Sequence, residues 1–176
     1  DTNSHGFFMR DEADLERVIV EAHVDGWQTA THCVGDRASA CVISAFEKSE
    51  KALPGQSPRH RIEHYFCPPD GGLARMKVLG ALIVTQPSFL ARMRRSILEA
   101  FGPDAHSKYP ARSVIDAGVT YVGSSDAPTG HVSPWIGMAN AVDRGASLGT
   151  PIGPDETSGE LFARLSRPRR RLGLER

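Results

Sequence analysis

The chain has 176 residues, 21 basic against 21 acidic side chains, no formal net charge and 40% hydrophobic residues. This length predicts about one domain, and the ordinary composition excludes a collagen, a disulfide-rich scaffold and a wholly disordered protein. The balanced charge argues against nucleic acid as a partner. No apolar run approaches the roughly 18 residues that a membrane-spanning helix needs, which argues against a membrane protein.

The N-terminus and the cysteines bear on the cellular location. Residues 1–5 (DTNSH) contain neither the basic nor the apolar region of a secretory signal, and the chain does not begin with Met. The three cysteines, Cys33, Cys41 and Cys67, are odd in number and form no Cys-x-x-Cys pair. We therefore expect reduced thiols in a cytoplasmic protein, and we expect an upstream part that this chain lacks.

Helical and strand-like patterns alternate along the chain. Strands are predicted at Trp27–His32, Arg61–Tyr65, Ala81–Thr85 and Val119–Gly123. Helices are predicted after the caps Asp11 and Asp36 and over 73–79, Leu90–Ala100, Ala111–Ala117 and Pro134–Arg144. About four strand–helix units predict a parallel α/β sheet. Because a complete (β/α)₈ barrel needs about 250 residues, the chain is either a small open α/β domain or half of a barrel.

Side chains that can bind a metal follow three of the predicted strands. His32 follows the first strand, His64 the second and Asp126 the fourth. The carboxyl ends of parallel strands meet at one edge of a sheet, so we expect these side chains to lie together. Imidazole and carboxylate suit Zn²⁺ and related ions, and such an ion lowers the pKa of a bound water to about 7. Asp126 could then bind the ion and accept the proton of that water.

Structural interpretations stay open beside this one. A histidine at a strand end often serves only to complete local hydrogen bonds, and Asp126 precedes Ala-Pro as a turn residue would. We interpret His60 as structural, and His23 as an imidazole that favours the dipole at the end of its helix. His131, between the Asp126 turn and Trp135, is interpreted as a solvated loop residue in preference to one that lines a substrate pocket. Cys33 is interpreted as a small buried residue rather than a nucleophile.

Five segments together carry a resemblance. The runs GWQTATHCVGDRA (26–38) and RHRIEH (59–64) are followed by QPS (86–88), SDAP (125–128) and a helix-like stretch that ends in AVDR (141–144). In this order they resemble the YtcJ-like proteins, family 3 of the amidohydrolase superfamily. The resemblance covers roughly residues 5–156.

The resemblance implies a metal-dependent hydrolase that acts mainly on carbon–nitrogen bonds other than peptide bonds, such as those of N-substituted formamides. It implies that residues 1–156 form the C-terminal half of a (β/α)₈ barrel, strands five to eight. His32, His64 and Asp126 would be metal ligands, and Asp126 would also be the catalytic base. A divalent metal, first of all zinc, would activate water against the carbonyl of a small-molecule amide. The resemblance does not identify the substrate-binding residues.

Two departures from the family pattern limit the implied site. The His-x-His of strand one and the bridging ligand of the earlier strands are absent, so the chain holds at most half of a two-metal site. Residues 157–176 are rich in Arg and Pro, and we expect a divergent, disordered tail there. Because four open strands leave unpaired edges, we expect a homodimer or pairing with the missing N-terminal half. A non-catalytic half-barrel remnant and a small α/β binding domain remain alternatives.

Overall fold

The computed structural model describes residues 6–56 and 58–144. The chain divides into two compact units. The first holds the described residues up to Thr85 together with Ser107–Tyr121, and the second holds Gln86–His106 and the described residues from Val122 onward. The predicted tail at 157–176 and the end of the predicted barrel part, 145–156, lie outside the described residues.

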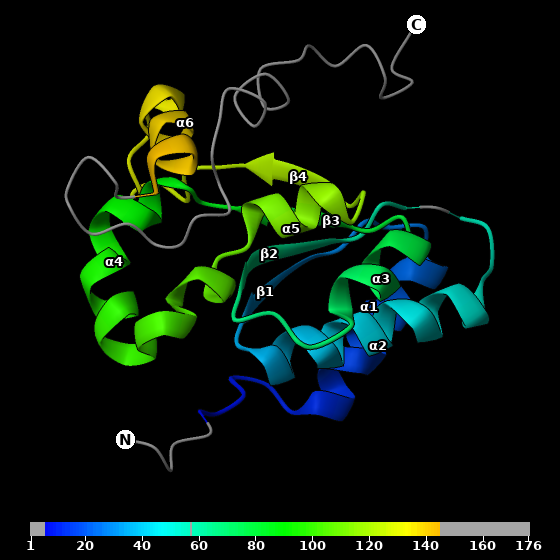
Figure 1. Ribbon diagram of the computed structural model, residues 1–176. Helices are drawn as coiled ribbons and strands as arrows, with labels where there is room; N and C mark the ends of the chain where they lie inside the picture. The colour runs from blue at the N-terminus through cyan, green and yellow to red at the C-terminus, as the bar shows by residue number, and fades with distance from the viewer. Residues whose placement is uncertain (1–5, 57, 145–176) are drawn as a thin grey trace, which may run out of the picture. The chain divides into compact units, whose positions relative to one another are not determined.

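The first unit alternates helices and strands (Figure 1). Its elements are α1 (Glu12–Val24), β1 (Ala30–Val34), α2 (Asp36–Ala52), β2 (Arg61–Phe66), α3 (Gly72–Val78), β3 (Leu82–Thr85) and α5 (Ala111–Asp116). The second unit holds α4 (Ser88–Phe101) and α6 (Pro134–Asp143), which pack against each other. A 3₁₀ helix (Gly102–Lys108), which was not predicted, and strand β4 (Thr120–Gly123) each begin in one unit and end in the other.

The strands form one sheet in the order β1-β2-β3-β4. β1 pairs with β2 and β2 pairs with β3, both in parallel, so the predicted parallel α/β architecture is confirmed. The register places His32 opposite Glu63 and Cys33 opposite His64, and it then slips by one residue, so that Val34 lies opposite Phe66. A slip of this kind is a β-bulge, which turns the side chains beyond it relative to the sheet.

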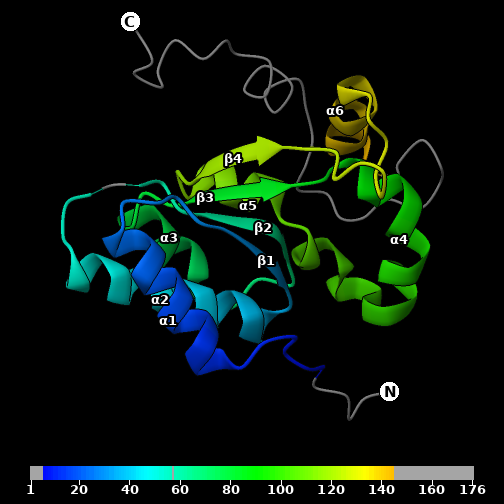
Figure 2. The same cartoon turned by 180° about the vertical axis from the view of Figure 1, so that it is seen from behind.

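One face of this sheet carries the core of the first unit. Cys33, Ile62 and Ile83, one from each of three neighbouring strands, are buried in the same apolar cluster. The helices add further apolar side chains to this cluster, namely Ile19, Val42, Ile43, Phe46, Met76 and Val114. In both views α1, α2 and α3 lie below β1 and β2 (Figures 1 and 2). The opposite face of β1 and β2 is more open, and in a closed barrel it would face the interior.

The start of α1 is confirmed and the start of α2 is corrected. The Oδ1 atom of Asp11 accepts hydrogen bonds from the backbone N–H groups of Ala13 (3.0 Å) and Asp14 (3.2 Å), as predicted for a helix cap. Asp36, in contrast, is the first residue of α2, and Gly35 occupies the cap position with a φ of 110°. Few residues other than glycine adopt such a conformation, so the turn out of β1 determines which residue caps the helix.

A smaller difference concerns the first strand. β1 begins at Ala30 rather than at Trp27, whose side chain lies in a loop and is 69% exposed. Trp27, the one large hydrophobic residue of the predicted strand, therefore lies outside the sheet. Within the described residues, no helix has both the length and the apolar character that a membrane span requires.

Candidate functional site

Two of the three predicted ligands lie side by side in the first unit. The imidazole rings of His32 and His64 have centroids 4.5 Å apart and meet edge to face, at an interplanar angle of 70°. His32 lies on β1 and the half-buried His64 on β2. Two ligand nitrogens of a tetrahedral zinc ion lie about 3.4 Å apart when each bond is about 2.05 Å long. Rings this close can supply one nitrogen each to a single ion.

The bulge in β2 explains how the two rings come together. In a regular parallel register, Cys33 and His64 would share a face of the sheet, and His32 would lie on the other face. Instead His64 and its neighbour Tyr65 have φ values of 73° and 51°, in the left-handed region that residues with a Cβ rarely adopt. Backbone strain of this kind is concentrated at functional sites. Here it occurs at a predicted ligand, where the strand changes the direction of its side chains.

A carboxylate lies beside this pair in the sheet. Glu63 is opposite His32 in the register, and its Oε1 atom lies 2.7 Å from Nε of Arg61. Carboxylates near metal-binding histidines commonly orient the imidazole and fix its tautomer. Glu63 was not singled out from the sequence, although the RIEH run places it one residue before His64.

The third predicted ligand, Asp126, lies in the second unit, in the loop after β4. Its φ is 50°, and its carbonyl oxygen accepts hydrogen bonds from the N–H groups of Thr129 (2.8 Å) and Gly130 (3.2 Å). Its side chain is exposed. Within either unit taken alone, the described residues contain no cluster of three or more His, Cys, Asp or Glu side chains that could hold a metal. The grouping of Asp126 with the two histidines therefore stays a prediction.

The side chains interpreted as structural are built into the core of the first unit. His60 and His23 are buried, and Nδ1 of His23 lies 2.9 Å from Nε2 of His60. The sequence did not reveal this pairing, because the two residues are 37 positions apart. Burial raises the pKa of the Cys33 thiol to about 12, so this cysteine is no nucleophile at neutral pH.

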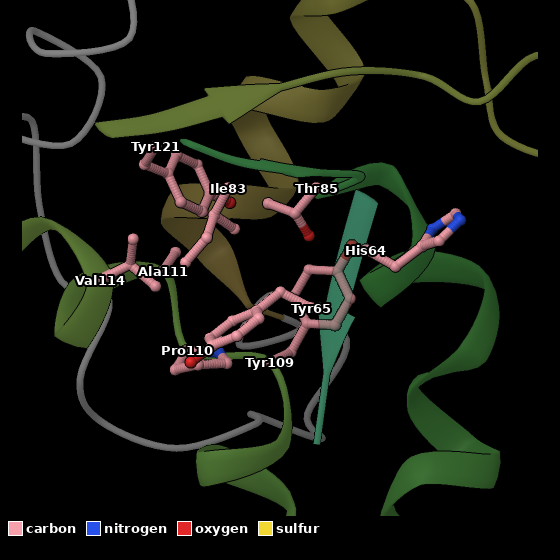
Figure 3. Close-up of a pocket in the computed structure, with 9 residues that line it drawn as sticks. All are labelled: His64, Tyr65, Ile83, Thr85, Tyr109, Pro110, Ala111, Val114 and Tyr121. Carbon is pink, nitrogen blue, oxygen red and sulfur yellow. The ribbon is translucent and has the colours of Figure 1, made fainter. Parts of the chain in front are cut away.

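A narrow cavity lies beside β2 and β3, and the candidate ligand His64 is one of the residues that line it (Figure 3). Its walls include Tyr65, Thr85 and Tyr109, and burial raises the pKa of the Tyr65 hydroxyl to about 12. Figure 3 shows the His64 ring directed away from the tyrosines, although the residue lines the cavity. The cavity measures about 10 Å³, about the space that one water occupies. It is therefore packing space inside the unit and not a substrate site.

The loop residues of the second unit that lie near Asp126 in the sequence line a larger cavity, of about 500 Å³. Ser124 and Ser125 form part of its wall, and so does His131, which the sequence analysis interpreted as a solvated loop residue. Gln86, almost completely buried, donates a hydrogen bond from Nε2 to Oγ of Ser124 (2.9 Å).

Comparison with known proteins matches almost the whole chain to one protein family. The family model described as "Amidohydrolase family" matches residues 2–176. The chain is 29% identical over 149 residues to YtcJ of Bacillus subtilis, an amidohydrolase by name, with coverage of 84% of this chain and 27% of YtcJ. It is 31% identical over 147 residues to the N-substituted formamide deformylase of Arthrobacter pascens, with coverage of 82% and 27%. The chain thus spans about a quarter of the length of the curated relatives that it matches.

A solved structure supports the fold. The crystal structure of an uncharacterized metal-dependent hydrolase from Pyrococcus horikoshii OT3 aligns with 94% of this chain and 30% of its own, with a TM-score of 0.70 and 24% identity. This likeness concerns the fold. Together with the parallel strand order, it agrees with the partial (β/α)₈ barrel that the sequence predicted.

Proposed function

Because the chain belongs to the amidohydrolase family, we propose that it is the C-terminal part of a metal-dependent hydrolase that cleaves carbon–nitrogen bonds of small-molecule amides. The observation that carries this proposal is the pair formed by His32 and His64, two imidazoles 4.5 Å apart on neighbouring parallel strands. The relative from Arthrobacter pascens, named for N-substituted formamides, supports an amide substrate.

The residues present fit a divalent metal by the chemistry of their donor atoms. His32 and His64 offer nitrogens and Asp126 offers carboxylate oxygens, a donor set typical of zinc in hydrolases. When bound, the ion would act as a Lewis acid that polarises a carbonyl group and lowers the pKa of a bound water to about 7. Zinc is the ion that we propose, and the further ligands of a full site would come from barrel strands outside this chain.

Each side chain then has a separate task. The two imidazoles would hold the ion, and the bulge between His64 and Phe66 fixes the angle between the rings. Asp126, at the carboxyl end of β4, accepts the proton of the attacking water and passes it to the leaving nitrogen. Glu63 lies opposite His32 in the register and would orient that imidazole when the ion is bound.

The free edge of β1 and the reduced cysteines indicate what the chain pairs with and where it is located. β1 has a partner strand on one side only within the described sheet, so its other edge offers backbone groups for pairing. We propose that this edge meets the preceding strand of a complete barrel, or else a second copy of the chain, in the cytoplasm. The thiols of Cys33, Cys41 and Cys67 are free, which suits a reducing compartment.

Metal binding by the 176-residue chain tests the proposal. Titration with Zn²⁺ at neutral pH, followed by calorimetry, is expected to show saturable binding. His32→Ala and His64→Ala should each lower the affinity by more than the roughly 10–100-fold that is typical of outer-shell changes. Asp126→Asn should weaken binding as well, and Asp70→Asn, at another exposed loop carboxylate, is the matched control.

The outcomes separate the proposal from its alternatives. Equal zinc affinity in the wild type and in both histidine variants would remove the metal assignment and leave a small α/β binding domain. Zinc binding without hydrolysis of an N-substituted formamide, even when a polypeptide that supplies the earlier barrel strands is added, would leave a non-catalytic remnant. Hydrolysis that appears on mixing and is lost in Asp126→Asn would support the full proposal.

A further inference from the structure

The cavity of the second unit has the size of a ligand site. It measures about 500 Å³ and is lined by Pro87, by residues 123–125 at and after the end of β4, and by residues 131–135, Gly137 and Met138 before and within the start of α6. Pockets for small organic ligands commonly measure about 300–1,000 Å³. Every lining residue belongs to the second unit, so the cavity is formed within one compact part of the chain.

The walls of the cavity are apolar and carry no formal charge. Trp135 is 68% exposed and Val132 is 73% exposed, and Met138 and Pro134 extend the apolar surface. Large apolar side chains that gather at an exposed, concave surface commonly mark a binding site. Among the described residues that line the cavity, none is Asp, Glu, Lys or Arg. Such a lining favours an uncharged group, because a charge placed there would lose its hydration without gaining a partner.

His131 adds a hydrogen-bond donor to the lining, beside the hydroxyls of Ser124, Ser125 and Ser133. Its Nδ1 atom accepts a hydrogen bond from the backbone N–H of Ser133, at 3.0 Å, so this nitrogen carries no proton. The proton of the uncharged imidazole is therefore on Nε2. A few donors in the lining of a largely apolar cavity favour ligands that carry an acceptor oxygen.

A buried side chain outside the lining holds Ser124, one of the polar residues of the cavity wall, in place. Gln86 is 1% exposed, and its Nε2 atom donates to Oγ of Ser124, a residue of the lining, at 2.9 Å. A buried amide in this position fixes the loop after β4 against the loop after β3. The cavity is thus preformed, which lowers the entropic cost of binding.

We propose that this cavity binds an uncharged aromatic group that carries a hydrogen-bond acceptor, with the ring against Trp135 and the acceptor at Nε2 of His131. An aromatic ring fits the exposed indole because offset or edge contacts between aromatic rings add to the burial of apolar surface. The assignment of this group to the N-substituent of an amide substrate rests on the proposed function. Binding of the group itself does not depend on a metal.

The test uses the metal-free chain and two matched probes. N-Benzylacetamide carries a ring and an acceptor, and n-butylbenzene carries the ring alone. In the Trp27→Phe protein, where Trp135 is the remaining tryptophan, N-benzylacetamide is expected to shift the fluorescence emission to the blue, with saturation. Calorimetry should show about tenfold weaker binding of both probes to Trp135→Ala. Trp27→Ala, at an equally exposed tryptophan in the first unit, should leave binding unchanged.

His131→Ala isolates the hydrogen bond. Loss of one donor should weaken N-benzylacetamide binding by roughly fivefold and leave n-butylbenzene binding unchanged. A carboxylate on the ring of the probe should weaken binding at least as much, because the lining offers no cation. Absence of a saturable shift, equal effects of the two tryptophan variants, or tighter binding of the carboxylate probe would each overturn the inference.

The two proposals fail separately. If zinc does not bind but N-benzylacetamide does, only the hydrolase assignment is lost. If zinc binds through the histidines and the probe does not bind, only the assignment of this cavity is lost.

Discussion

The side chains of His23 and His60 form a hydrogen-bonded pair in the core of the first unit, with Nδ1 of His23 2.9 Å from Nε2 of His60. The backbone N–H of Thr29 donates to Nδ1 of His60 (3.1 Å), and Nε2 of His23 lies 2.8 Å from the carbonyl oxygen of Leu53. These two backbone partners determine which ring nitrogens carry protons. The N–H of Thr29 requires an acceptor at Nδ1 of His60, and the carbonyl oxygen of Leu53 requires a donor at Nε2 of His23. His60 therefore donates through Nε2 to His23, and His23 donates to Leu53.

The pair is expected to make the protein sensitive to acid. Burial, and then the nearby His23, lower the pKa of His60 to about 4, against 6.5 in an unfolded chain. Between these values the unfolded state binds more protons, so the free energy of unfolding falls as the pH decreases from about 6.5 to about 4. The full effect is on the order of 3 kcal/mol, from about 1.4 kcal/mol per pKa unit.

Urea denaturation at a series of pH values measures this dependence. His60→Gln removes the titrating group, so its free energy of unfolding should vary less with pH across the same range, although the variant is less stable at neutral pH. His131→Gln, at an exposed imidazole, is the control and should keep the slope of the wild type. An unchanged slope in His60→Gln would contradict the lowered pKa of His60.

Gly72 and Tyr65 are expected to show coupled effects on stability. A Cβ at Gly72 would lie 2.7 Å from the hydroxyl oxygen of Tyr65 and 3.0 Å from Cγ of Pro69. Gly72→Ala should therefore lower the free energy of unfolding by about 1–3 kcal/mol. Tyr65→Phe alone should cost little, because within the described part of the chain this buried hydroxyl has no hydrogen-bond partner.

The double variant distinguishes this contact from a general effect of the substitution. Tyr65→Phe should restore part of the stability that Gly72→Ala loses, as thermal denaturation of the four proteins in the cycle would show. Gly137→Ala in α6 is the control, since a Cβ there meets nothing within 4 Å and should stabilise the helix by about 0.5–1 kcal/mol. Additive losses in the cycle would falsify the coupling.

Gly130 is expected to control the loop that holds Asp126. A Cβ at Gly130 would clash with the carbonyl oxygen of Ser125, and backbone cannot move aside as a flexible side chain can. Gly130→Ala should therefore displace the turn in which Gly130 donates to the carbonyl oxygen of Asp126. Zinc affinity should fall about as far as in Asp126→Asn, while Gly137→Ala retains it. Wild-type affinity in Gly130→Ala would show that this turn does not position a ligand.

The ion pair between Glu47 and Arg75 joins α2 to α3. Nε and Nη2 of Arg75 donate to the two carboxylate oxygens at 2.7 and 2.8 Å, and Nη2 also donates to Ser44 at 2.9 Å. Arg75 lowers the pKa of the Glu47 carboxyl, so its contribution is present above the ordinary pKa and is lost as the pH falls through the lowered value.

Solvent weakens this interaction, because the side chains of Arg75 and Glu47 are 34% and 36% exposed. Glu47→Gln should lower the free energy of unfolding by about 0.5–1 kcal/mol at neutral pH, and less in high salt. Glu99→Gln removes the pair with Arg95, whose side chains are 63% and 88% exposed, and should have no measurable effect. Chemical denaturation at two salt concentrations compares the variants, and equal losses would contradict the difference in burial.

The elements were predicted where a local pattern determines them. Asp11 caps α1 because its carboxylate reaches N–H groups two and three residues ahead, and such a signal depends on neighbours in the sequence alone. The period of apolar residues likewise predicted the alternation of helices and strands, and through it the sheet edge to which His32 and His64 belong. The resemblance to YtcJ-like proteins named the same two residues, and the amidohydrolase family membership is confirmed.

The order of helices and strands, the family and the side chains that could bind a metal can all be inferred without coordinates. The folded chain was needed to show that β2 bulges at His64, that Gly35 rather than Asp36 caps α2, that His23 bonds His60, and that Trp135 and His131 share a cavity wall. The two groups of features differ in range. Helix caps and apolar periods arise from neighbours a few positions away, whereas a bulge, a buried hydrogen bond or a cavity depends on segments that lie far apart in the sequence and meet only when the chain is packed.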